Sequence, residues 1–118
     1  MRLILLTLAL VSSVLLTAGY AHAAGAAKAA QRQDADRYTC SWGAGTAARA
    51  QELKLAGVSL YAARQKIQAY SFDRSWKRML AMRITEQTYD SPSRYKAEAV
   101  RQVFYQDCVK YKNRTAAR

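Results

Sequence analysis

The chain has 118 residues, of which 19 are Lys or Arg and 8 are Asp or Glu, so its net charge at pH 7 is +11. This length allows one small domain, and the charge favours acidic proteins and other anionic components of the cell envelope as partners. With one histidine and two cysteines, the chain has few side chains suited to acid–base or nucleophilic chemistry. We therefore expect no catalytic site, no cofactor and no metal site.

The first 23 residues have the features of a secretory signal peptide. Arg2 supplies the positive charge, residues 3–16 form an apolar run, and residues 21–23 form a small-x-small cleavage site. The alternative, an uncleaved membrane anchor, would need about 20 apolar residues, and the run at residues 3–16 is shorter than that. Cleavage would remove the single histidine and leave 18 basic and 8 acidic residues, a net charge of +10. The product is expected in the periplasm or outside the cell, without stable membrane insertion.

Residues 24–37 carry no large apolar side chain, and the sequence leaves open a flexible leader and a frayed helical extension. Residues 38–112 must then form the helical domain, and a core of that size gives only marginal stability by itself. In an oxidising compartment two cysteines are normally paired, so we expect a disulfide between Cys40 and Cys108. It would close a loop of 69 residues and stabilise the fold by about 4 kcal/mol.

The apolar spacing predicts four helices and no strand. The first spans residues 38–56, or begins only after Gly43 and Gly45, each of which costs about 1 kcal/mol relative to alanine. Gly57 is expected as its left-handed C-terminal cap, and Ser59 as the N-cap of the second helix. The expected buried stripe of the first helix is Cys40, Ala44, Ala47, Ala48, Gln51 and Leu55. That of the second is Leu60, Ala63, Ile67 and Tyr70.

Ser71 or Asp73 is expected to cap the third helix, and Ser91 to cap the last, which spans residues 92–112 and leaves residues 113–118 as a basic tail. The third helix is expected to bury Phe72, Trp76, Met79, Leu80 and Ile84, with Arg83 at the margin. The last is expected to bury Ala97, Val100, Val103, Phe104, Cys108 and Tyr111. Paired cysteines at opposite ends of the chain predict antiparallel first and last helices. The expected fold is a compact all-α array of four helices tied by one disulfide.

Aromatic and cationic residues alternate along the helices, as they do in surfaces that bind partners. Tyr70, Trp76 and Tyr111 fall on the expected stripes and are assigned to the core, whereas Tyr61 and Tyr105 fall outside them and are expected to be exposed. We predict partner contacts at Tyr61, Arg64, Arg78, Arg101 and Tyr105. A solvated surface without a specific partner is the alternative. The sequence leaves a homodimer open and disfavours nucleic acid as a partner.

Several residues together resemble small secreted two-cysteine helical proteins of Gram-negative bacteria. The resemblance lies in a cysteine within an Ala-rich first helix, a Gly-x-Ser turn at residues 57–59, a Tyr-Asp-Ser-Pro break at residues 89–92 and a Phe-x-x-Asp-Cys ending at residues 104–108. In layout the chain is similar to the amidase-immunity proteins of type VI secretion systems. Those are helical, disulfide-bonded periplasmic proteins that block an incoming cell-wall amidase. The resemblance implies an inhibitor but identifies no inhibitory residue.

These features lead us to expect an exported, non-enzymatic binding or inhibitor module that acts through a basic, tyrosine-containing surface. Three alternatives remain: a type VI amidase-immunity protein, an envelope-stress chaperone that exposes apolar surface at low pH, and a small carboxylate-dependent hydrolase. For the hydrolase, Glu86 and Asp90 are spaced to share a helix face. Their neighbours Arg83 and Arg94 favour surface ion pairs instead.

Overall fold

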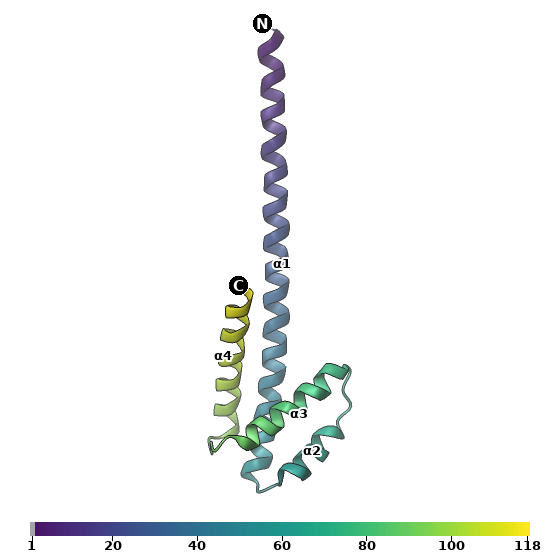
Figure 1. The fold of residues 1–118 in the computed structure, drawn as a ribbon, viewed down its shortest axis with the longest axis vertical. Helices are drawn as coiled ribbons and strands as arrows, with labels where there is room; N and C mark the ends of the chain where they lie inside the picture. The colour runs from purple at the N-terminus through teal and green to yellow at the C-terminus, as the bar shows by residue number, and fades with distance from the viewer. Residues whose placement is uncertain (1) are drawn as a thin grey trace. The chain divides into compact units, whose positions relative to one another are not determined.

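The structure is a computed structural model that describes the backbone of residues 2–118 and the side chains of residues 22–118. Its described part contains four α-helices and no strand: α1 (Arg2–Leu55), α2 (Leu60–Gln68), α3 (Ser75–Asp90) and α4 (Ala97–Ala116) (Figure 1). The predicted signal peptide at residues 1–23 lies, except for its last two side chains, outside the described side chains, and its cleavage stays a prediction. Within the described residues, no helix combines the length and apolarity needed to cross a bilayer.

The chain divides into two compact units, Met1–Ala35 and Asp36–Arg118. The first belongs to α1, and of its described side chains all except Ala29 are exposed. Residues 24–37, for which the sequence leaves a leader and a helical extension open, are helical throughout. The core and the candidate site lie in the second unit.

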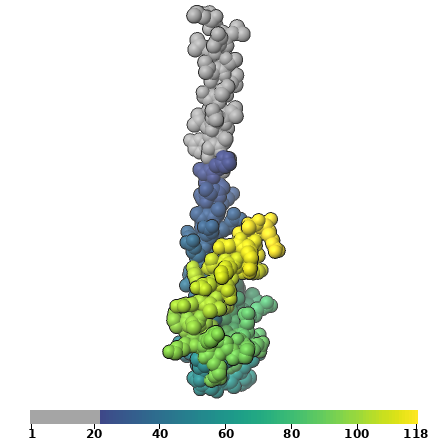
Figure 2. All heavy atoms as spheres, turned by 90° about the vertical axis from the view of Figure 1, so that its left-hand side faces the viewer, coloured from purple at the N-terminus to yellow at the C-terminus, as the bar shows by residue number. Residues whose placement is uncertain are grey.

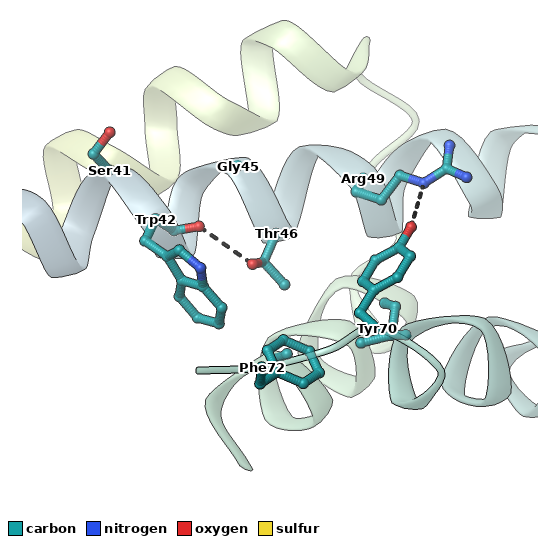
Figure 3. A pocket seen from close by; sticks show the side chains of 9 residues that line it. Ser41, Trp42, Gly45, Thr46, Arg49, Tyr70 and Phe72 are labelled. Atoms are coloured by element: carbon teal, nitrogen blue, oxygen red, sulfur yellow. Dashed lines mark hydrogen bonds between the residues drawn. The ribbon is translucent and has the colours of Figure 1, made fainter. Parts of the chain in front are cut away.

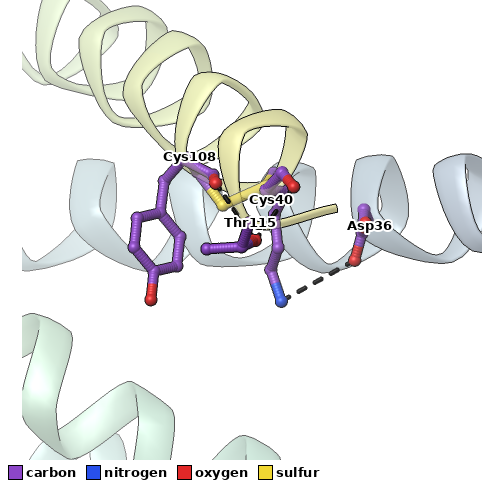
Figure 4. Close-up of polar contacts among 6 residues, drawn as sticks. Asp36, Cys40, Cys108 and Thr115 are labelled. Carbon is purple, nitrogen blue, oxygen red and sulfur yellow. Dashed lines mark hydrogen bonds and ion pairs between the residues drawn. A yellow bond between two sulfur atoms is a disulfide. The ribbon is translucent and has the colours of Figure 1, made fainter. Parts of the chain in front are cut away.

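In the second unit, α4 runs antiparallel to α1 (Figure 1), and Figure 2 views the molecule from the side of α4. A disulfide joins Cys40 to Cys108, whose Cα atoms are 5.6 Å apart (Figure 4). One turn further toward the C-terminal end of α4, Lys112 Nζ lies 3.7 Å from Asp36 Oδ1. The predicted fold class and the predicted disulfide are therefore confirmed.

Gly43 allows α4 to approach α1 closely. A Cβ atom at this position would lie 2.8 Å from Cε1 of Phe104, so the aromatic ring packs against bare helix backbone. The helix continues through Gly43 and Gly45 without a break, and a start after the two glycines is therefore wrong. Packing at this interface outweighs the helix penalty of about 1 kcal/mol per glycine.

Small side chains form much of the core. Within the described side chains, the fully buried apolar residues are Cys40, Ala44, Ala47, Ala48, Ala50, Leu53, Ala63, Ile67, Ala81 and Ile84. The predicted stripe of α1 is confirmed, because Gln51 is also buried and Leu55 is half-buried. In α2, Ala63 and Ile67 are buried as predicted.

Both predicted caps between α1 and α2 are confirmed. Gly57 has φ = +79°, and the Val58 N–H donates to the Leu53 carbonyl at 3.0 Å, which is the Schellman arrangement that ends many helices. The Ser59 hydroxyl accepts from the Ala62 N–H at 3.2 Å. The turn from α1 into α2 is thus determined by local sequence.

The inward face of α3 differs from the predicted one. It consists of Lys77, Ala81, Ile84, Thr85 and Thr88. Of these only Ile84 was predicted, and Trp76 and Met79, both assigned to the core, are 37% and 64% exposed. The hydroxyls of Thr85 and Thr88 donate to carbonyls of the preceding turn at 2.7 and 2.8 Å, which satisfies these buried polar groups. An assignment from hydrophobicity alone therefore selected the wrong face.

Three further side chains assigned to the core lie at the surface: Tyr70, Val103 and Tyr111, which are 46%, 52% and 58% exposed. Tyr105, expected to be exposed, is half-buried. Residues spaced by four face inward on α4, namely Val100, Phe104, Cys108 and Lys112, and all are half-buried. The disulfide and the contact of Phe104 with Gly43 fix this rotation of α4.

The start of α3 is not capped as predicted. Neither Ser71 nor Asp73 is the N-cap; that position is Arg74, which makes no side-chain capping bond. The carboxylate of Asp73 instead lies 2.8 Å from Nζ of Lys77. Asp73 is thus paired with a cation one turn along the helix and does not cap the helix start.

The last helix begins at Ala97, so the predicted start at residue 92 is wrong. The buried Gln51 side chain donates from Nε2 to the carbonyls of Ser93 and Tyr95, at 3.1 and 2.8 Å. These bonds hold the connection between α3 and α4 in a non-helical conformation. At its other end α4 extends to Ala116, so most of the predicted tail is helical.

Lys54 holds the end of α3. Its ammonium donates to the carbonyls of Thr88 and Ser93, at 3.1 and 2.9 Å, and also to that of Ser91. A cation at this position complements the negative end of the helix dipole. Gln51 and Lys54, one turn apart on α1, therefore determine where α3 stops and where α4 begins.

Candidate binding site

A pocket of about 320 Å3 opens between α1 and the segment that links α2 to α3 (Figure 3). Trp42, Gly45 and Thr46 of α1 line one wall, and Tyr70 and Phe72 of the linking segment line the opposite wall. Pockets of this size accept a small organic group or one large side chain. The pocket lies entirely within the second unit.

Aromatic rings give the pocket its shape. The rings of Trp42 and Phe72 meet edge to face with centroids 6.4 Å apart, and Tyr70 and Phe72 are 6.5 Å apart. Trp76 of α3 packs edge-on against Trp42 at 5.6 Å. Such pairs add about 0.5–1.5 kcal/mol to the burial of the rings themselves. The four residues Trp42, Tyr70, Phe72 and Trp76 form what we call the aromatic cluster.

Arg49 lies at the rim of the pocket. Its Nε donates to the hydroxyl of Tyr70 at 3.4 Å, and its Nη1 lies 3.0 Å from a carboxylate oxygen of Glu52. Hydrogen bonds to Tyr70 and then to Glu52 raise the pKa of Arg49 above its ordinary value. Arg49 is therefore a charged guanidinium held at the rim of an apolar cavity by Tyr70 and Glu52.

Two more arginines lie near the pocket. The guanidinium carbon of Arg78 is 5.8 Å from the ring centroid of Phe72, a cation–π arrangement. Arg101 reaches α1 from α4, because a Cβ atom added at Gly45 would lie 3.4 Å from its Nη1. Arg101 also pairs with Glu98 at 3.1 Å. Arg78 therefore lies beside Phe72 and Arg101 beside Gly45, and both of these residues line the pocket.

Lys77 holds α3 against α1 beside the pocket. Its side chain is 91% buried, and Nζ donates to the Tyr38 hydroxyl and pairs with Asp73, both at 2.8 Å. The same ammonium lies 5.3 Å, 5.9 Å and 5.7 Å from the ring centroids of Tyr38, Trp42 and Trp76. The bond with Asp73, and then that with Tyr38, raises the pKa of Lys77. The bond with Lys77 lowers the pKa of Asp73.

The structure brings together only some of the predicted contact residues. Arg78 and Arg101 lie near the pocket, whereas Tyr61 is 73% exposed on α2 and Arg64 pairs with Glu86 at 3.4 Å. Tyr105 is half-buried on α4. Two of the five positions therefore lie beside residues of the pocket wall, and the role of all five as partner contacts stays a prediction.

Sequence reasoning missed the pocket itself, because its walls come from residues assigned to the core or given no role. Trp42 and Arg49 received no role, and Tyr70 and Phe72 were placed on buried stripes. A usable signal was available: two aromatic residues at positions 70 and 72, beside Ser71 and Asp73, indicate a connection rather than a continuous helix. Aromatic rings in a connection are often available to line a cavity.

Glu86, one of the acidic residues considered for catalysis, is engaged in an ion pair. Glu86 is paired with Arg64, and within residues 22–118 no three His, Cys, Asp or Glu side chains gather as metal ligands.

Comparison of the chain with protein-family models, with curated proteins and with solved structures gave no match.

Proposed function

We propose that this chain is an exported, non-enzymatic binding module that holds an acidic partner protein, with an apolar side chain of the partner in the pocket. The aromatic pocket with Arg49 at its rim carries this proposal. Aromatic walls remove an apolar side chain from water, while a guanidinium at the rim provides hydrogen bonds to a neighbouring carboxylate. An apolar residue next to Asp or Glu fits both features.

The charge of the whole chain supports an acidic partner. The 19 basic residues exceed the 8 acidic residues by 11, or by 10 once residues 1–23 are removed, and such an excess accelerates association with acidic proteins. Tyrosine, tryptophan and arginine are also the residues that most often dominate the energy of protein interfaces. A rigid aromatic pocket with a fixed charge needs little reordering on binding.

The disulfide supports the export part of the proposal. Disulfides persist in the periplasm and outside the cell and are rare in the cytosol, and here the bridge joins the first and last helices. An inhibitor of an incoming enzyme, as the resemblance implies, would be one form of this role, since inhibition needs only tight binding.

A peptide library displayed on phage tests the proposal, because it samples many candidate partner segments at once. Selection on the disulfide-bonded protein is expected to enrich sequences that place an aromatic or large aliphatic residue beside Asp or Glu. Synthetic versions should lose affinity for Arg49→Gln and Phe72→Leu proteins. Arg94→Gln, which removes an exposed arginine from the connection between α3 and α4, serves as the matched control. Failure to enrich such sequences, or equal binding to Arg49→Gln and wild-type protein, would contradict the proposal.

A further inference from the structure

The outward face of α3 carries an apolar and cationic ridge. Trp76, Met79 and Arg83 are spaced by three and four residues, so they line one side of the helix over two turns. All three are exposed, Trp76 by 37% and Met79 by 64%. The sequence pattern assigned this stripe to the core, yet the structure buries the opposite face. We call these three residues the α3 ridge.

We infer that the α3 ridge is a docking surface for an acidic amphipathic helix of the partner protein. This inference rests on the proposed role as a binding module and names a second contact surface next to the pocket. Rows of side chains spaced by three and four residues fit into the grooves of another helix. Trp, Met and Arg are also enriched at protein interfaces.

Charge on α3 determines the kind of partner. Arg74, Arg78 and Arg83 are exposed, and none of them is in an ion pair in the described part of the chain. The acidic residues nearest to these arginines in the sequence are already paired, because Asp73 pairs with Lys77 and Glu86 pairs with Arg64. The ridge therefore has an uncompensated positive charge that attracts carboxylates. A second copy would place arginines against arginines, which opposes self-association.

The geometry also favours a protein over a lipid surface. A helix that binds a bilayer inserts a broad apolar face among the lipids, whereas Trp76 and Met79 are the only large apolar side chains exposed along α3. The remaining apolar residues of this helix face the core or are half-buried. Two anchors flanked by arginines suit contact with another helix.

Trp76 is already fixed in place. Its ring packs edge-on against Trp42 and lies over the ammonium of Lys77, so binding would cost little side-chain entropy. Trp42 also lines the pocket. The aromatic cluster thus connects the pocket to the α3 ridge.

A synthetic acidic helix tests the inference. The probe is a fluorescent helical peptide with leucines spaced by three and four residues and glutamates at the other positions, titrated by anisotropy against the full disulfide-bonded chain. Met79→Glu and Arg83→Glu are each expected to weaken binding about tenfold, because an anchor is lost or a charge is reversed. Val103→Glu on α4, which changes an apolar side chain of similar exposure, is the matched control and is expected to bind normally.

The possible results separate the inference from its alternatives. Equal weakening by Val103→Glu, or unchanged binding by Met79→Glu, would overturn it. A third result would favour a lipid surface and overturn the inference. In that case the protein binds anionic phosphatidylserine vesicles tightly, Met79→Glu abolishes this binding, and the peptide does not bind. If library-selected peptides require Arg49 while the acidic helix does not require Met79, the proposed function stands and the docking surface fails. If neither probe binds, both fail.

Discussion

Two sides of α1 are held by different means. Toward α4 the contact includes Gly43 under the Phe104 ring and a disulfide, and no residue of α4 is fully buried. Toward α2 and α3 the contact consists of the aromatic cluster and the buried Lys77 ammonium, with a pocket left open. The disulfide allows α4 to stay attached to α1 although none of its side chains is fully buried. The other side depends on non-covalent contacts, and the aromatic and cationic groups that would bind a partner lie there.

Removal of the disulfide would affect the α4 side most. Cys40→Ser with Cys108→Ser is expected to lower the free energy of unfolding by about 4 kcal/mol, because half-buried contacts alone must then hold α4. Urea denaturation measures the loss. Hydrogen exchange should show faster exchange in α4 than in α2 or α3, since the contacts of those helices are unchanged. Uniformly faster exchange in all helices would show that the two sides unfold together and would weaken the comparison.

Gln51 on α1 tests the hydrogen bonds that hold the connection leading into α4. Gln51→Leu keeps a similar volume but deprives the carbonyls of Ser93 and Tyr95 of their buried donor. We expect a loss of about 2 kcal/mol, within the range for unsatisfied polar groups, with faster exchange confined to residues 91–97. Gln65→Leu on the exposed face of α2 is the control. Unchanged stability in Gln51→Leu would mean that water replaces the side chain.

Gly43 and Gly45 provide a matched pair two residues apart. Alanine at position 43 gains about 1 kcal/mol of helix propensity but meets the Phe104 ring, and overpacking of this kind costs about 1–3 kcal/mol. We expect net destabilisation of about 1 kcal/mol. Alanine at position 45 meets only the flexible end of Arg101 and is expected to be neutral or stabilising. Thermal denaturation of both variants measures the difference, and equal stability of the two would show that the ring moves aside freely.

The same contrast explains how much of the structure could be predicted from the sequence. The pairing of α1 with α4 and the turn from α1 into α2 follow simple rules, since the two cysteines determine the first and Gly57 with Ser59 determines the second. The inward face of α3 does not. Lys77 and Thr85 are buried because specific partners satisfy them, and no periodicity of apolar residues reveals those partners.

The pocket was missed for a related reason. Tyr70 and Phe72 continue the helical spacing of the neighbouring stripes, although they lie in a connection. Trp76 and Met79 have the spacing of a core stripe yet face solvent. Hydrophobicity indicates that a residue avoids water but does not distinguish burial in the core from burial by a partner. Arg78 and Arg101 were selected for their charge and lie beside Phe72 and Gly45 of the pocket wall, and their role as partner contacts stays a prediction.

The pair between Asp73 and Lys77 gives the smallest expected effect and tests whether the α3 side responds to pH. The pKa of Asp73 is lowered in the folded state, so its contribution to stability is present above its unfolded pKa of about 4 and is lost as the pH falls through the lowered value. Asp73→Asn should therefore have a lower Tm than wild type at neutral pH, and this difference should shrink in acid. Because Asp73 is exposed, the difference should be small and should decrease with added salt.

The raised pKa of Lys77 makes stability depend on pH in the opposite direction. Its contribution is present below its unfolded pKa of about 10.4 and is lost as the pH rises through the raised value. Tm measurements on wild type and Asp73→Asn from about pH 3 to about pH 7 check the acid side, with Glu98→Gln, which breaks the exposed pair with Arg101, as the control. A constant difference in Tm across that range would show that Asp73 acts through packing rather than charge. The aromatic rings, the buried face of α3 and the Lys77–Tyr38 bond would then hold this side without the charge of Asp73, and acid would leave the α3 ridge in place.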